Sequence, residues 1–200
     1  MIRHALPLRV ETSTEGADPR LAEMGLQQAD RVPTAIARHH IVRVVSSPQA
    51  RARQTAEPTA TALGLPVDIE PGLAEYDHGL PFYIPIEQAK HDFVEAYERI
   101  KGGELPEFVD PAAFKGRVID AVHSIVASTE HTDTVVAFAH GGVINSYLQD
   151  VLGTAKTLAF PIDYCSVTRI LFSRSGRRTV ATVNENSHVW DLLPRNIERG

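Results

Sequence analysis

The sequence has one cysteine, Cys165, among its 200 residues. A single thiol excludes a disulfide within the chain, and it also excludes a zinc site built from paired cysteines. Such low cysteine usage is typical of a reducing compartment. The first residues contain no apolar run like the hydrophobic region of a signal peptide. We therefore expect a cytoplasmic protein.

Long hydrophobic runs and an excess of positive charge are lacking as well. No stretch approaches the roughly 20 apolar residues that a membrane-spanning helix needs, so we expect no membrane association. The chain carries 25 acidic and 20 basic residues, which gives a net charge of −5. A general nucleic-acid binder usually shows a basic footprint, so we expect no nucleic-acid partner. A local cationic pocket is still compatible with this balance, because a few residues suffice to build one.

The chain has enough residues for one domain with a core of its own. Two valine-rich runs, 41–47 and 134–139, are typical of parallel strands that are covered on both faces. The segments 166–172 and 178–183 are predicted to pair antiparallel through a short turn. Helices are expected over residues 20–39, 49–63, 112–129 and 142–153. This alternation predicts an α/β fold, a three-layer α/β/α sandwich with a mainly parallel sheet.

Residues 71–110 interrupt the alternation with four prolines and a glycine pair, and a short helix is predicted over 87–100. We interpret this segment as a small helical lid insertion within a single domain that spans residues 1–200. Long connections in α/β folds often carry function, so it is expected to form a lid or a wall of the substrate site. Phe82 and Tyr83 favour a partly aromatic wall. For the segment as a whole, a purely structural crossover is the alternative. For Phe82 and Tyr83, packing within the lid is the alternative.

Three predicted strand ends carry unusual residues, and ligands of open α/β sheets bind beyond the carboxyl ends of strands. The stretch "IRH" places Arg3 and His4 at the first end. The stretch "SSPQARARQTAE" places Arg51 in the first turn of a helix. The stretch "AHGGVI" places His140 before two glycines and a helix N-terminus, whose N–H groups and dipole favour an anion.

These residue types suit a phosphate ester. The guanidinium groups of Arg3 and Arg51 can bind a phosphoryl group through forked hydrogen bonds. His4 can attack the phosphorus, and His140 can stabilise the charge that develops in the transition state. The leaving oxygen needs a proton, and Glu75 is the candidate general acid, with a pKa raised near bound phosphate. The alternative for Glu75 is a loop carboxylate that pairs with a cation of the lid.

Taken in this order, the motifs resemble those of the histidine phosphatase superfamily, which includes the cofactor-dependent phosphoglycerate mutases. "RHA" at 3–5 is similar to the family's "RHG", and "SSPQARARQTA" at 46–56 is similar to "SSPxxRAxQTA". Leu73, Glu75 and Gly79 match "LxExxxG", and "HGGVI" begins at His140. The resemblance covers nearly the whole chain.

The resemblance implies a role for each matching residue. His4 becomes phosphorylated, while Arg3, Arg51 and His140 form the phosphate pocket. Glu75 donates the proton. The implied partner is a small phosphorylated substrate, and no metal and no cofactor are required, because protein side chains supply the positive charge.

Four departures from the family pattern stand out. Ala5 replaces the usual glycine, and Asn145 stands where an arginine commonly follows "HGGVI". A familiar asparagine near the phosphate is missing, and the candidates to replace it lie within residues 12–14, namely Thr12, Ser13 and Thr14. Only two residues precede Arg3, so we expect a short first strand that leaves the edges of its neighbours exposed.

We interpret the chain as a metal-independent histidine phosphatase that hydrolyses a phosphomonoester through a phosphohistidine intermediate on His4. A phosphoglycerate mutase-type phosphotransferase is the first alternative, and the lean 71–110 segment disfavours it. A binding protein for phosphate esters that has lost turnover is the second, and the departures from the family pattern favour it. The physiological substrate and a homodimeric state are left open by the sequence.

Overall fold

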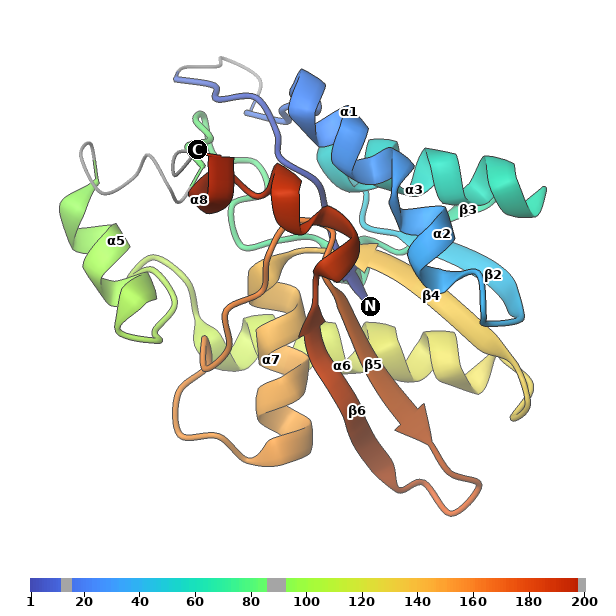
Figure 1. Cartoon of the computed structure of the whole chain (residues 1–200). Helices are drawn as coiled ribbons and strands as arrows, with labels where there is room; N and C mark the ends of the chain where they lie inside the picture. The colour runs from blue at the N-terminus through green and yellow to red at the C-terminus, as the bar shows by residue number, and fades with distance from the viewer. Residues whose placement is uncertain (12–15, 86–92, 198–200) are drawn as a thin grey trace.

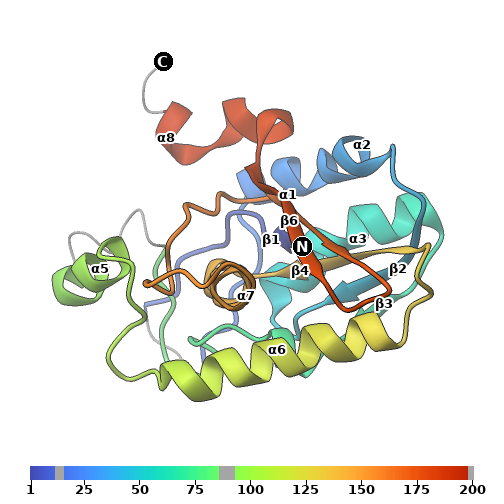
Figure 2. The same ribbon diagram turned by 90° about the horizontal axis from the view of Figure 1, so that it is seen from below.

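The structure, a computed structural model, describes residues 1–11, 16–85 and 93–197. Within these residues six strands form one sheet in the order β3-β2-β4-β1-β5-β6. The neighbours from β3 to β1 pair parallel, and β5 and β6 add an antiparallel edge. Helices α1, α2 and α3 cover one face of the sheet, and α6 and α7 cover the other (Figures 1 and 2). The predicted three-layer α/β/α sandwich is confirmed.

Strands β2 and β4 coincide with the two valine-rich runs of the sequence. The strand bounds are β1 Ile2–Arg3, β2 Ile41–Ser46, β3 Val67–Ile69, β4 Thr134–Ala139, β5 Val167–Phe172 and β6 Arg178–Glu185. The sequence analysis did not predict β3, because its three residues lie at the sheet edge and form no apolar run. The expected pairing of β5 with β6 is confirmed.

The expected helices are present with shifted bounds. They are α1 Glu23–Asp30, α2 Val32–Ile36, α3 Ala50–Leu63, α5 Val94–Lys101, α6 Pro111–Ala127 and α7 Gly141–Leu152. The structure adds α8 Pro194–Ile197 and 3-10 turns at Pro71–Leu73 and Ser187–Leu192, which the sequence analysis did not predict. The helix expected over 20–39 is divided at Arg31, and Pro33 stands in the first turn of α2, where its missing N–H costs nothing. Of the helix predicted over 87–100, residues 87–92 lie outside the described residues.

The central strand β1 is two residues long, as expected, whereas its neighbours β4 and β5 have six residues each. Ile2 lies opposite Phe138 of β4 and Val167 of β5. The strands β4 and β5 diverge with distance from β1 (Figure 1), and a cavity of about 540 Å³ lies between them. Val135 and Ile170 line it from the two strands.

In the part of the chain that the structure describes, no helix combines the length and the apolar character that crossing a bilayer requires.

Candidate active site

The carboxyl ends of β1, β2 and β4 meet at one edge of the sheet. The backbone N–H of His4 donates to the carbonyl of Ala139 at 2.9 Å, and that of Ser47 donates to the carbonyl of Phe138 at 2.9 Å. These bonds continue the pairing of β1 and β2 with β4 by one residue beyond the carboxyl ends of β1 and β2. The sheet therefore brings the three motif-bearing segments together before any side chain interacts.

The two motif histidines lie side by side. The ring centroids of His4 and His140 are 5.1 Å apart, and both side chains are buried. Nδ1 of His4 lies 2.7 Å from the carbonyl oxygen of Ala5. Because a carbonyl only accepts, Nδ1 carries the proton and Nε2 keeps its lone pair. The ring of His4 is thus set up to react through Nε2.

Electrostatics keep both rings neutral. Burial, together with the guanidinium groups of Arg51 and Arg3, lowers the pKa of His4 well below its usual value. Burial and the charge of Arg51 lower the pKa of His140 in the same way. Nε2 of His140 lies 2.7 Å from the hydroxyl of Ser47, and its Nδ1 is buried with no hydrogen-bond partner among the described residues. A neutral imidazole is the nucleophilic form, because protonation consumes the lone pair.

The two arginines are held by different partners. Nη2 of Arg51 donates to both carboxylate oxygens of Asp77, at 2.7 and 2.9 Å. Nε and Nη1 of this buried guanidinium find no acceptor among the described residues. Arg3 donates from Nη1 to the carbonyl of Ile162 at 2.6 Å and lies over the ring of Tyr164 at 3.9 Å. Buried polar groups are nearly always hydrogen-bonded, so the open donors of Arg51 indicate a site for an oxyanion.

The buried carboxyl group of Glu75 is held by two backbone N–H groups. Its Oε2 accepts from the N–H of Gly142 at 2.8 Å, and its Oε1 accepts from the N–H of Tyr76 at 3.1 Å. Burial and the nearby charge of Asp77 raise the pKa of Glu75 to about 7. A carboxyl with that pKa is about half protonated at neutral pH, so it can both donate and accept a proton.

The sequence analysis missed three residues that form hydrogen bonds in and around the segment of Glu75, namely Gln49, Asp77 and Arg117. Gln49 accepts from the N–H of Glu75 at 2.7 Å and donates to Asp77 at 2.9 Å. Arg117 of α6 donates to the carbonyls of Gly72 and Ala74, at 2.8 and 2.9 Å. Gln49 lies within the "SSPQ" motif and Asp77 follows Glu75 by two residues, so their neighbourhood in the sequence could have identified both as site residues. Arg117 lies outside every motif, so nothing in the sequence indicated its role.

The departures from the family pattern have structural explanations where they can be described. Ala5 is fully buried and its N–H donates to the hydroxyl of Thr55 at 2.9 Å, so its methyl group is accommodated. Asn145 donates to the carbonyl of Phe160 at 3.0 Å and accepts from its N–H at 3.0 Å. Asn145 therefore anchors the loop after α7 to the site. The candidates Thr12, Ser13 and Thr14 lie outside the described residues.

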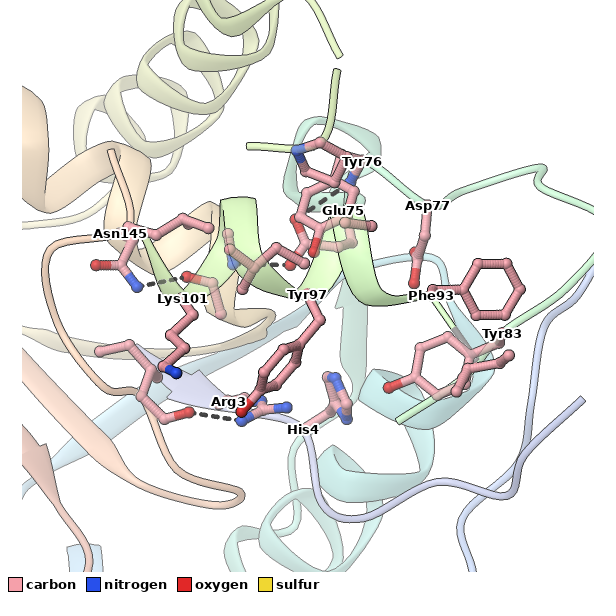
Figure 3. A pocket seen from close by; sticks show the side chains of 18 of the residues that line it. Arg3, His4, Glu75, Tyr76, Asp77, Tyr83, Phe93, Tyr97, Lys101 and Asn145 are labelled. Atoms are coloured by element: carbon pink, nitrogen blue, oxygen red, sulfur yellow. Dashed lines mark hydrogen bonds between the residues drawn. The ribbon is translucent and has the colours of Figure 1, made fainter. Parts of the chain in front are cut away.

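A cavity of about 820 Å³ opens at this sheet edge. Four of the five residues singled out by sequence line it, namely Arg3, His4, Arg51 and Glu75. His140 is wholly buried beside His4. Figure 3 shows Arg3, His4, Glu75 and Tyr97 around one space. In the described ranges, no three histidine, cysteine or acidic side chains gather as they would around a metal ion.

Gly142 is required by the close approach of Glu75, and this leads to a first prediction. A Cβ at position 142 would come within 2.4 Å of Oε1 of Glu75, so Gly142→Ala displaces the carboxyl group. We expect kcat for alkyl phosphate esters to fall by about tenfold or more, because a misplaced acid transfers its proton poorly.

The matched control is Gly116→Ala on α6, where an added Cβ meets nothing within 4 Å. This variant should keep full activity and gain slight stability from the better helix former. Steady-state kinetics and thermal unfolding of both variants check the prediction. Wild-type kcat in Gly142→Ala would contradict it.

The family of the chain follows from comparison with known proteins. The model of the histidine phosphatase superfamily (branch 1) matches residues 1–186. A probable phosphoglycerate mutase of Proteus mirabilis is 26% identical over 198 residues, covering 92% of this chain and 89% of that protein. Phosphoserine phosphatase 1 of Hydrogenobacter thermophilus is 26% identical over 186 residues, covering 88% and 85%.

Solved structures share the fold at lower identity. A mutant phosphoserine phosphatase from Entamoeba histolytica, in complex with phosphoserine, superimposes with a TM-score of 0.72 at 21% identity, covering 94% of this chain and 96% of that one. A mycobacterial glucosyl-3-phosphoglycerate phosphatase in complex with VO3 has a TM-score of 0.74 at 21% identity, covering 92% and 97%.

Proposed function

Because the chain belongs to the histidine phosphatase superfamily, we propose that it is a phosphatase that hydrolyses a small phosphomonoester through a phosphohistidine on His4. One observation carries the proposal. A neutral, buried imidazole with its lone pair on Nε2 lies in the same cavity as two guanidinium groups. An anion that binds to the two arginines therefore meets a nucleophile that burial and their charge keep unprotonated.

In the first step, Arg3 and the open donors of Arg51 hold the phosphoryl oxygens. Nε2 of His4 attacks the phosphorus, so a P–N bond forms while the ester P–O bond breaks. Glu75 gives its proton to the departing oxygen, and the alcohol leaves. His140 stabilises the charge on the phosphoryl group through Nδ1, with its Nε2 accepting from the hydroxyl of Ser47. Preorganised donors of this kind act strongly in a buried site.

In the second step, water attacks the phosphohistidine. The Glu75 carboxylate left by the first step takes a proton from this water, the P–N bond breaks, and its electron pair returns to Nε2. Inorganic phosphate then leaves the arginines. Glu75 ends the cycle protonated and His4 ends it neutral, so both groups return to their starting states.

The proposal includes independence from metal ions, because Arg3 and Arg51 neutralise the phosphoryl charge. We expect excess EDTA to change kcat for an aryl phosphate by less than about twofold, whereas removing a catalytic metal costs several kcal/mol of transition-state stabilisation. Assays before and after chelation and dialysis test this. A large loss that added divalent cation restores would show that the arginines are not sufficient.

A trapping experiment tests the intermediate itself. The protein is mixed with an aryl phosphate that carries the radiolabel in its phosphoryl group, and the reaction is quenched in alkali. We expect a protein-bound label that is stable in alkali and lost in acid, as a phosphoramidate bond behaves. An acid-stable label, as on serine, would overturn the assignment to histidine. Binding without release of inorganic phosphate would favour the non-catalytic binding protein.

Transfer to a second substrate hydroxyl, as in a mutase, needs a site for a doubly anionic substrate. Beyond Arg3 and Arg51, Lys101 is the one lysine or arginine of the described ranges that lines the cavity, and most of its side chain is exposed. This charge distribution favours hydrolysis over mutase transfer. A cytoplasmic location and a homodimer stay predictions.

A further inference from the structure

Helix α5 presents an apolar face to the cavity instead of to the core. Phe93, Ala96, Tyr97 and Ile100 recur at the spacing of one helical face, and all four line the cavity. No residue of α5 is buried. Figure 1 shows the helix standing apart from the three layers. Surface helices normally bury such a face against the protein, so this face is available to a ligand.

The other described walls have the same character. The chain has seven phenylalanines and five tyrosines, and seven of these twelve side chains line the cavity. Phe82 stacks on Phe93 with ring centroids 5.2 Å apart and an interplanar angle of 13°, so the segment around Phe82 packs against the start of α5. Leu158 and Phe160 line the cavity from the loop that Asn145 anchors.

The positive charge of the cavity walls is concentrated near His4, on Arg3 and Arg51. Lys101, the further cation of the described walls, lies 3.8 Å from Glu98, and its side chain is 64% exposed. The carboxylate of Asp77 is held by Arg51, and that of Asp163 is held by Arg195. Beyond Arg3 and Arg51, the described walls therefore offer no buried cation to a second anionic group of a substrate. An unpaired carboxylate among aromatic side chains would be costly.

Building on the proposed function, the geometry points to an ester whose alcohol is uncharged, apolar and ring-bearing. The phosphoryl group binds to Arg3 and Arg51, and the ring of the alcohol lies between α5, Phe82 and Phe160. The named relatives include a phosphoserine phosphatase and a phosphoglycerate mutase. Phosphoserine and phosphoglycerate carry a carboxylate close to the ester, so this specificity separates the chain from those proteins.

The test compares esters that require the same chemistry. Ethyl phosphate, 2-phenylethyl phosphate, O-phosphoserine and 3-phosphoglycerate all release an aliphatic alcohol, so leaving-group activation does not bias the comparison. We expect kcat/KM for 2-phenylethyl phosphate to exceed each of the others by about tenfold or more, mainly through a lower KM, because burying a phenyl ring stabilises the complex.

Variants of α5 locate the contact. Ile100→Ala shortens a side chain on the cavity face, and we expect it to raise KM for 2-phenylethyl phosphate about three- to tenfold while KM for ethyl phosphate stays constant. Val94→Ala is the matched control on the same helix, because Val94 is 55% exposed and does not line the cavity. It should alter neither substrate's kinetics.

The outcomes separate this inference from the proposed function. If O-phosphoserine or 3-phosphoglycerate is hydrolysed as well as 2-phenylethyl phosphate, the inference is wrong and the phosphatase stands. If Ile100→Ala behaves like Val94→Ala, the ring does not bind against α5 and the inference also fails. If none of the esters is hydrolysed, both the inference and the proposed function fail.

Discussion

His4→Ala is expected to lower the turnover of phosphate esters on the order of 10⁴-fold or more, the scale on which removal of a covalent nucleophile acts. Alanine leaves the two guanidinium groups in place but removes the nitrogen that attacks phosphorus. Phosphate or vanadate should therefore still bind to the variant, and the alkali-stable label should disappear. Initial rates, a binding titration and the trapping experiment together measure the effect.

His123→Ala is the control for the general cost of removing a histidine. His123 is exposed on α6, where its ring contacts Tyr147, and it does not line the cavity. We expect its activity to stay within about twofold of the unmodified protein, since exposed substitutions rarely have large effects. If His4→Ala keeps a tenth or more of the activity, a phosphohistidine at this position is not the route.

Glu75→Gln is expected to have the second-largest effect, and the effect should depend on the leaving group. For an alkyl ester, whose alcohol leaves poorly without a proton, we expect a loss of about 10²- to 10⁴-fold. For 4-nitrophenyl phosphate, whose phenolate leaves without help, the loss should be only a few-fold in the phosphorylation step. Glutamine can still accept from the N–H of Gly142, so the change removes the proton and keeps most of the geometry.

The pH profile supplies the sign of the effect. Burial and the charge of Asp77 raise the pKa of Glu75 to about 7, so the protonated acid is present below pH 7 and is lost above it. For an alkyl ester, kcat/KM should therefore fall about tenfold per pH unit on the alkaline side. The pKa of His4 lies well below its usual value, so His4 stays neutral across this limb and does not cause it.

This fall of kcat/KM above pH 7 should be absent in Glu75→Gln. With the unmodified protein it should be weak for 4-nitrophenyl phosphate. Equal slowing of the phosphorylation step of both esters by Glu75→Gln, measured as kcat/KM, would remove Glu75 from the acid role. In that case its contact with Gly142 would point to a purely structural task, the alternative that the sequence left open for this loop carboxylate.

The sequence by itself determined the layers and the positions of the motifs. Strands β2 and β4 are valine-rich runs, interrupted in β2 by Arg43, and runs of this kind that alternate with helices are typical of strands covered on both faces. Arg3 ends β1, His4 and His140 directly follow β1 and β4, and Arg51 lies in the first turn of the helix after β2. Parallel strand order therefore places all four at the carboxyl ends of the strands. Each of these signals lies within a few consecutive residues.

Only the tertiary structure decided how the acid is held and what the cavity walls are. Arg117 donates to the carbonyl of Gly72 across 45 positions of sequence, and Gly142 donates to Glu75 across 67. Periodicity identifies the apolar face of α5 but not whether it packs on the core or faces the cavity. Such contacts depend on where separate segments meet, and spacing within one segment carries no information about that.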